Sequence, residues 1–136
     1  APIAGPQVVP PALSDYAAGQ FQSAISGFES YIRQFPTFER ADEAQQYIGD
    51  AHRAEMRLTE ALNAYNLVIQ NYPTGDQAPW AYYKRGLVLR SLKRLEEARA
   101  SLEQATKMPN KEVAGLAGQV LVGVDAELKA KPAQKP

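Results

Sequence analysis

Residues 21–36 read FQSAISGFESYIRQFP, and the same pattern returns 37 positions later in residues 58–73, which read LTEALNAYNLVIQNYP. Apolar and small residues occupy matching places in the two stretches, and each stretch ends in an aromatic residue followed by proline. A third copy begins at Leu95, and Gly49 recurs as Gly86 at the same offset. Repeats of this length are typical of stacked units that bury their apolar faces only against one another.

The periodicity within the repeats is helical, because apolar residues recur at i, i+3, i+4 and i+7, and no stretch keeps the alternation of a strand. The sequence therefore predicts an all-α fold of three helix hairpins, in units at about 12–36, 39–73 and 77–109. Thr37 and Asp76 are the predicted N-caps of the helices that open the second and third hairpins. The predicted helices are 12–18, 21–34, 39–55, 58–71, 77–92, 95–107 and 111–128.

The last predicted helix, 111–128, has no hairpin partner and is expected to cap the third unit. Gly115, Gly118 and Gly123 each weaken it by about 1 kcal/mol relative to alanine, so packing must hold it in place. Its apolar stripe is formed by Val113, Leu116, Ala117, Val120, Leu121, Val124 and Leu128.

The two ends of the chain differ from the helical domain expected at 12–130. Residues 1–11 contain four prolines among small residues, which indicates a Pro/Ala-rich linker or tail. Residues 131–136 have a similar composition and are expected to form a flexible tail. Whether further residues precede Ala1 stays open at this point.

Composition excludes several classes of function. The formal net charge is zero, which removes a general electrostatic argument for binding nucleic acid or a lipid surface. No apolar run approaches the roughly 18–20 residues that cross a bilayer. Cysteine is absent, so disulfides, thiol nucleophiles and thiolate metal sites are excluded.

No set of residues predicts catalysis, a metal site or a cofactor. The single histidine, His52, has no acid and nucleophile at suitable spacing and is interpreted as a packing residue. The adjacent acidic pairs Asp42-Glu43 and Glu96-Glu97 point to different sides of their helices and are interpreted as solvated. The protein is therefore predicted not to be an enzyme.

Three features recur in the units: a small residue in the second helix, a glycine in the first helix, and a proline at the end. They lie at Ala24, Ala61 and Ala98, at Gly49 and Gly86, and at Pro36 and Pro73. This spacing resembles the tetratricopeptide repeat. The resemblance implies a right-handed solenoid of three helix hairpins plus a C-terminal capping helix. It also implies that the first helix of each hairpin lines a groove, and that this groove binds another protein.

The segments 16–32 and 70–76, which read YAAGQFQSAISGFESYI and QNYPTGD, further resemble the Tol-Pal-associated YbgF/CpoB family of periplasmic cell-division coordinators. The resemblance implies a periplasmic interaction module whose partner is a TolA-like or peptidoglycan-synthesis protein. In this family a signal peptide and a coiled coil precede the repeats, and they would lie upstream of Ala1. The coiled coil would allow the protein to form oligomers. Arg53 departs from the family, where an aromatic residue is expected. The alternative is a structural or assembly scaffold of an outer-membrane complex, similar to BamD, with no groove ligand.

The repeat's usual groove positions identify the candidate binding residues. Trp, Tyr and Arg are enriched at binding hot spots, which favours the set in the third unit. The alternative for Trp80 is a packing role between the second and third hairpins. The groove candidates are Tyr16, Gln46, Asp50, Arg53, Trp80, Tyr83, Leu87 and Arg90.

Overall fold

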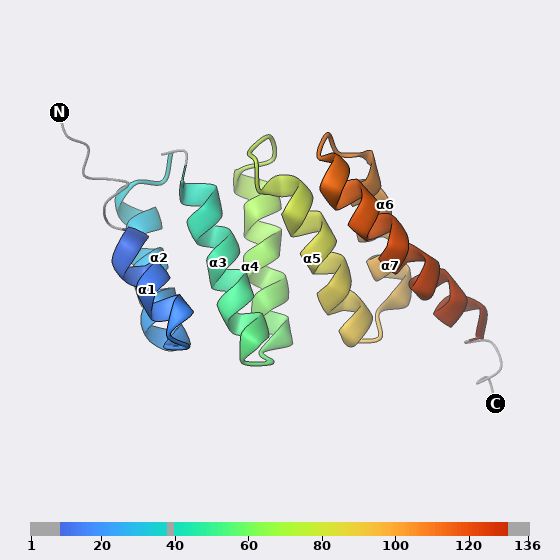
Figure 1. Cartoon of the computed structure of the whole chain (residues 1–136), viewed down its shortest axis with the longest axis horizontal. Helices are drawn as coiled ribbons and strands as arrows, with labels where there is room; N and C mark the ends of the chain where they lie inside the picture. Colours follow the sequence, from blue (N-terminus) through green and yellow to red (C-terminus); the bar gives the residue numbers. More distant parts are fainter. Residues whose placement is uncertain (1–8, 38–39, 131–136) are drawn as a thin grey trace. The chain divides into compact units, whose positions relative to one another are not determined.

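The computed structural model describes residues 9–37 and 40–130, which form seven helices and no strand (Figure 1). The prediction of an all-α fold is confirmed, and three helices match their predicted bounds at both ends. The tail predicted at 131–136 and the first eight residues of the tail predicted at 1–11 lie outside the described residues. The helices are α1 (Val9–Ala17), α2 (Phe21–Gln34), α3 (Ala41–Ala54), α4 (Leu58–Asn71), α5 (Ala78–Ser91), α6 (Leu95–Lys107) and α7 (Lys111–Ala130).

Helix α1 begins at Val9, three residues before the predicted start at Ala12. The prediction was wrong because Pro10 and Pro11 were expected to oppose a helix. In the first turn of a helix the backbone N–H groups have no partner within the helix, so a proline there forfeits no hydrogen bond. The two prolines therefore begin α1 instead of preventing it.

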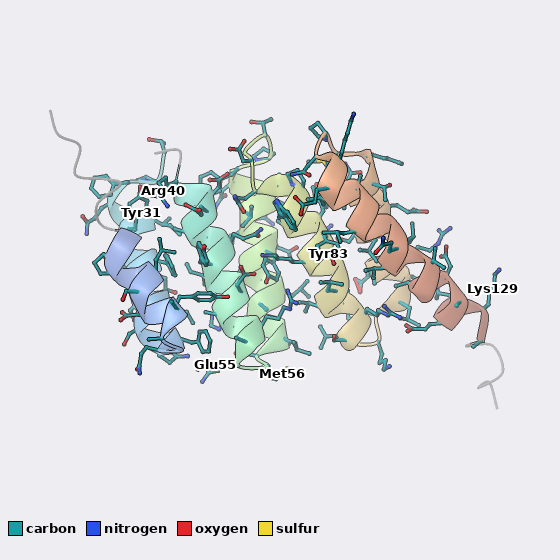
Figure 2. All side chains as sticks on the ribbon, in the orientation of Figure 1. Tyr31, Arg40, Glu55, Met56, Tyr83 and Lys129 are labelled. Atoms are coloured by element: carbon teal, nitrogen blue, oxygen red, sulfur yellow. The ribbon has the colours of Figure 1, made fainter. Side chains whose placement is uncertain are left out.

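The chain divides into two compact units at the boundary between Gln77 and Ala78. In the first unit α1 packs against α2, α2 against α3, and α3 against α4. The largest fully buried side chains of this unit are Phe28, Tyr31, Tyr65 and Val68 (Tyr31 is labelled in Figure 2). In the second unit α5, α6 and α7 pack against one another, with Val88, Leu102, Val113 and Val124 fully buried.

The hairpin turns repeat their backbone conformation every 37 residues. Gly19, Met56 and Lys93 have φ angles of 80°, 60° and 64°, which place all three in the left-handed region. Side chains with a Cβ enter this region at some cost, so glycine is the favoured residue there. Only the first turn uses glycine. The backbone conformation of the turn is thus kept in all three hairpins, although glycine is replaced by Met56 and Lys93 in the second and third.

Close contact between the helices of a hairpin explains the small residues of the pattern. Ala24, Ala61 and Ala98 are each completely buried. A Cβ atom on Gly49 would lie 2.5 Å from Cε1 of Tyr65, and one on Gly86 would lie 2.6 Å from Cγ of Leu102. The glycines therefore admit a large side chain from the second helix of the same hairpin.

Neither predicted N-cap is correct. The residue before α3 is Arg40, which makes no side-chain cap hydrogen bond, and Asp76 lies in a turn two residues before α5. Asp42, predicted to be solvated, is instead buried, and its carboxylate accepts a hydrogen bond from the backbone N–H of Gln77 at 3.3 Å. The backbone N–H of Gln77, just before α5, is thus satisfied by the carboxylate of Asp42 on α3. The side chain predicted to cap this helix was the neighbouring Asp76.

Asn110 provides an N-cap for α7 that was not predicted from the sequence. Its Oδ1 accepts a hydrogen bond from the backbone N–H of Val113, in the first turn of α7, at 3.0 Å. An asparagine in this position satisfies one of the N–H groups that the helix leaves unpaired. Helix α7 therefore has a defined start despite its glycines.

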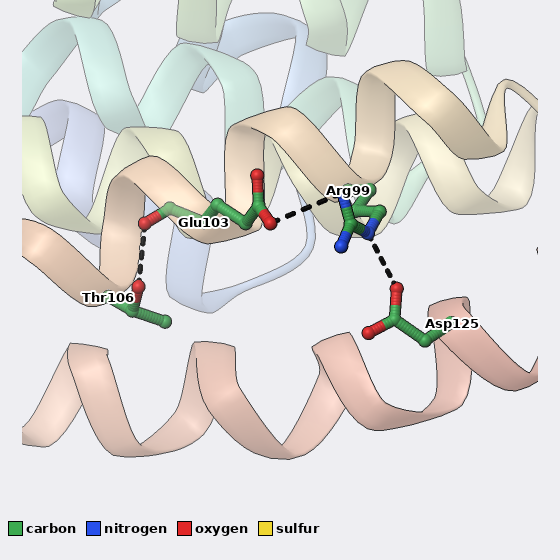
Figure 3. A network of polar contacts seen from close by, with 4 residues as sticks. All are labelled: Arg99, Glu103, Thr106 and Asp125. Atoms are coloured by element: carbon green, nitrogen blue, oxygen red, sulfur yellow. Dashed lines mark hydrogen bonds and ion pairs between the residues drawn. The ribbon is translucent and has the colours of Figure 1, made fainter.

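Arg99 shows how the third hairpin differs from the first two. At the equivalent positions the first two hairpins carry the apolar residues Ile25 and Leu62. Arg99 instead donates from Nε to Asp125 of α7 at 2.7 Å and pairs with Glu103 on its own helix at 3.3 Å (Figure 3). The polar residue on α6 thus meets a polar residue of α7, which covers this face of the hairpin.

Removing two glycines from α7 is expected to stabilise the second unit. A Cβ on Gly115 or Gly118 would meet nothing within 4 Å outside the local helix. Gly115→Ala and Gly118→Ala should each add about 1 kcal/mol to the free energy of unfolding, because alanine restricts the unfolded chain and favours the helix. Thermal unfolding followed by circular dichroism measures the gain. A decrease in melting temperature would mean that α7 is not a continuous helix in solution.

Candidate functional site

The predicted groove residues fall into two sets, one in each compact unit. In the first unit Gln46, Asp50 and Arg53 follow one another at i, i+4 and i+7 and share one side of α3. Tyr16 reaches the same region from α1, since its ring packs against Tyr47 of α3 with centroids 5.1 Å apart. Burial and Asp50 raise the pKa of Tyr16, and Arg53 lowers it. The structure therefore brings these predicted residues together at one place in the unit.

Asp50 is fixed by a residue of the opposite helix. The hydroxyl of Tyr65, on α4, donates a hydrogen bond to Oδ1 of Asp50 at 2.5 Å. Burial raises the pKa of Tyr65 well above its ordinary value, and the nearby Asp50 carboxylate raises it further, whereas Arg53 lowers it. Asp50 thus joins α3 to α4 and presents its carboxylate in a fixed orientation.

Aromatic rings support Tyr16 from both sides. Tyr16 packs edge-to-face on Phe21 and on Tyr47, with ring centroids 5.5 and 5.1 Å apart, and Tyr47 stacks on Phe28 at 5.2 Å. Burial raises the pKa of both Tyr16 and Tyr47 above the ordinary value of a phenol. Tyr47 was not predicted, because it lies one residue beyond the repeat's groove position at Gln46.

Gln46 is buried, with 3% of its surface exposed. Its Nε2 donates to Oε1 of Gln77 at 3.2 Å, and its own Oε1 is buried without a hydrogen-bond partner among the described residues. Burial leaves this side chain little surface for another protein. Its observed role is to join α3 to the segment that precedes α5.

In the second unit Trp80, Tyr83, Leu87 and Arg90 form one stripe along α5, and all four are partly buried (Tyr83 is labelled in Figure 2). The rings of Trp80 and Tyr83 pack edge-to-face with centroids 6.2 Å apart. Nζ of Lys84 lies 5.9 Å from the centre of the Trp80 ring, within the range of a cation–π contact. Neither aromatic side chain is completely buried in the unit.

Arg90 is paired within the unit. It donates from Nε and Nη2 to Oε2 of Glu127 on α7, at 3.0 and 2.6 Å. The pair raises the pKa of Arg90 and lowers that of Glu127. A Cβ on Gly123 would lie 2.8 Å from Nη2 of Arg90, so this glycine makes room for the guanidinium group. Any partner that uses Arg90 must compete with Glu127.

Tyr82 has a structural role beside the stripe. The guanidinium of Arg85 lies 5.0 Å from the Tyr82 ring and donates to Oγ of Ser101, which donates in turn to the backbone carbonyl of Tyr82 at 2.7 Å. Burial lowers the pKa of Arg85. The basic residue thus stabilises the α5–α6 hairpin, and Tyr83 rather than Tyr82 belongs to the candidate surface.

The described residues contain no group of three or more histidine, aspartate or glutamate side chains that could hold a metal ion. In the same part of the chain, no helix has both the length and the hydropathy needed to cross a membrane.

Comparison with known proteins gives a family and a fold. Residues 7–114 match the model of the YfiO family, described as outer membrane lipoprotein. A search of curated protein sequences finds no match. Several solved structures share the fold, each at a TM-score of 0.76, and they include helical repeat proteins of the tetratricopeptide type.

The Yersinia enterocolitica type III secretion chaperone SycD, in complex with a peptide of the translocator YopD, is 17% identical over 89% of this chain and 92% of its own. The first such repeat domain of Spaghetti, bound to an HSP90 peptide, is 18% identical over 92% and 93%. A type III secretion complex from Aeromonas hydrophila is 20% identical over 97% and 85%. At these identities the similarity establishes a tetratricopeptide-like helical solenoid.

Proposed function

The chain belongs to the YfiO family of outer membrane lipoproteins, and from that premise we propose that it is a non-enzymatic interaction module of the bacterial cell envelope. It binds a segment of another protein along the inner helices of its hairpins. The contact residues are the accessible members of each set: Tyr16, Asp50 and Arg53 in the first unit, and Trp80, Tyr83, Leu87 and Arg90 in the second. Gln46 is buried in the first unit and is left out of the contact surface.

The pair Trp80 and Tyr83 carries this proposal. Both rings stay partly exposed while they support each other, so each can bury further apolar surface against a partner without first losing much conformational freedom. Tyr16 is held in the same way by Phe21 and Tyr47. Rigid aromatic groups with a polar end are the usual anchors of protein interfaces.

The finer proposal concerns the cellular role. We propose a periplasmic location, a TolA-like or peptidoglycan-synthesis partner, and a part in Tol-Pal-linked coordination of cell division, on the basis of the YbgF/CpoB-like sequence segments. Membership in the YfiO family equally accommodates a scaffold of an outer-membrane assembly complex. The identity of the bound partner distinguishes the two roles.

The test is capture of partners from an envelope extract of the source organism on the immobilised chain. The variant is Trp80→Ala/Tyr83→Ala. The matched control is Met56→Ala/Val122→Ala, which removes two apolar side chains that are 72% and 71% exposed elsewhere. Circular dichroism must show equal helicity in all three proteins.

We expect the wild type and the control to retain the same Tol-system or wall-synthesis protein. The double variant should bind it at least roughly 30-fold more weakly, the loss expected from removing a hot-spot residue. Retention of outer-membrane assembly proteins alone would support the scaffold role instead. Equal retention by all three proteins would contradict the proposed binding surface.

A further inference from the structure

A concave surface lies in the first unit, on another side of α3 from Asp50. The walls of this cleft are α2 and α4, its floor is α3, and its volume is about 520 Å³. Gln45, Ile48 and His52 of the floor are centred about 130° around α3 from Gln46, Asp50 and Arg53, because successive residues of a helix are turned by about 100°. We call this surface the outer cleft. Its lining is Glu29, Ile32, Arg33, Gln45, Ile48, His52, Glu60, Asn63, Ala64 and Leu67.

The centre of the outer cleft is apolar. Leu67 is 41% exposed, which makes it one of the few large apolar side chains among the described residues so open to solvent, and Ile32 of the α2 wall is partly exposed. Ile48 closes the floor and is 5% exposed. An apolar surface that is concave and open to solvent gains free energy when another apolar group displaces its water.

The floor also carries a polar atom without a partner. Nδ1 of His52 is buried and has no hydrogen-bond partner among the described residues. The neighbouring Gln45 differs, since its Nε2 donates to the backbone carbonyl of Ala64 at 3.4 Å. Buried polar atoms in proteins are usually paired, so His52 is an exception in this floor.

Two carboxylates lie at the edge of the cleft, on its opposite walls. Glu29 of α2 and Glu60 of α4 are both exposed. Within residues 9–37 and 40–130, neither carboxylate forms an ion pair. The lining has one arginine, Arg33, one turn after Glu29, and no lysine, so with its histidine counted as neutral the two carboxylates outnumber the positive charges.

We propose that the outer cleft binds an amphipathic helical segment of a partner protein that carries lysine or arginine beside its apolar stripe. The apolar side chains cover Ile32 and Leu67, and the basic groups pair with Glu29 and Glu60. The wall of α4 from Glu60 to Leu67 is about 10 Å long, or two helical turns, which matches apolar residues spaced at i, i+3 or i+4 and i+7. This site is distinct from the surface that contains Trp80 and Tyr83.

The probe is a synthetic alanine-based helical peptide of about four turns, with leucines at i, i+4 and i+7 and lysines flanking them. The control peptide has glutamate in place of each lysine. Binding to the full chain is followed by amide chemical shifts in two-dimensional NMR spectra. We expect the lysine peptide to shift amides around Ile32, Ile48, His52 and Leu67, and to leave those around Tyr16 and Tyr83 unchanged.

Glu29→Gln/Glu60→Gln should weaken binding of the lysine peptide roughly fivefold, as expected for two exposed ion pairs. Gln34→Lys/Gln70→Lys is the matched control, because it changes the net charge equally on exposed positions of the same helices outside the cleft. Leu67→Asn, at an exposed position, should weaken binding about tenfold.

Three results would each overturn the proposal: no binding of the lysine peptide, shifts that map to another surface, or equal loss of affinity in the two charge variants. A preference for the glutamate peptide would also contradict it, since Arg33 would then outweigh the two carboxylates.

Discussion

Replacing Gly49 by alanine is expected to lower the free energy of unfolding by about 2–3 kcal/mol. The new Cβ would lie 2.5 and 2.7 Å from Cε1 and Cδ1 of Tyr65. The Tyr65 ring is fully buried and its hydroxyl is bound to Asp50, so it cannot turn aside without breaking that hydrogen bond. Gly86→Ala should have a similar effect, because the Cβ would lie 2.6 Å from Cγ of the buried Leu102.

Gly115→Ala is the control for this pair, since its Cβ meets nothing within 4 Å outside the local helix. Urea denaturation of the four proteins gives the comparison. If Gly49→Ala and Gly86→Ala were as stable as the wild type, the helices of these hairpins would not pack as closely as described. A further test is Gly86→Ala/Leu102→Val, where the smaller partner should recover part of the lost stability.

Stability is expected to fall as the pH rises above about 10, with ionisation of Tyr65 as one cause. Burial and Asp50 raise the pKa of Tyr65 in the folded state above its ordinary value of 10.0. In the unfolded chain this phenol ionises first, so its contribution is fully present below pH 10 and is lost progressively above it. The loss from Tyr65 alone approaches about 1.4 kcal/mol for each pH unit above 10.

Melting temperatures measured by circular dichroism between pH 8 and about pH 12 test this expectation against Tyr65→Phe. The variant is less stable at pH 8 because it lacks the hydrogen bond to Asp50, but its stability should fall less steeply as the pH rises. Burial also raises the pKa of Tyr16, Tyr47 and Tyr72, so some decline remains in the variant. Parallel slopes for the two proteins would mean that Tyr65 ionises as an exposed phenol does.

The sequence predicted the fold where the pattern was periodic. Helices α2, α4 and α6 begin after a hairpin turn and carry regular apolar spacing, so both of their ends were predicted correctly. Gly49 and Gly86 marked the close contacts because only small residues fit there. The start of α1 was missed because prolines in a first turn and prolines in an extended linker look alike in sequence.

Contacts between distant side chains could not be predicted in this way. Asp42 was predicted to be solvated because it stands next to Glu43 in an acidic pair. It is instead buried, and its carboxylate accepts a hydrogen bond from the backbone of Gln77, 35 residues away in sequence. Tyr65 was recognised as a repeat position, but its bond to Asp50 depends on how α3 and α4 face each other. Arg90 fits the groove pattern, and its ion pair with Glu127 follows only from the placement of α7. Charge and residue type suggest such pairs without identifying the partners.

Photo-crosslinking from Tyr83 in envelope extract of the source organism tests the central claim most directly. Benzoylphenylalanine replaces Tyr83 on α5 in one protein and the exposed Gln104 on α6 in a control. If the stripe on α5 binds a partner segment, Tyr83 should yield one heterologous adduct that Gln104 does not. No adduct from Tyr83, or the same adduct from both positions, would contradict the proposal that this chain binds its partner along the inner helices.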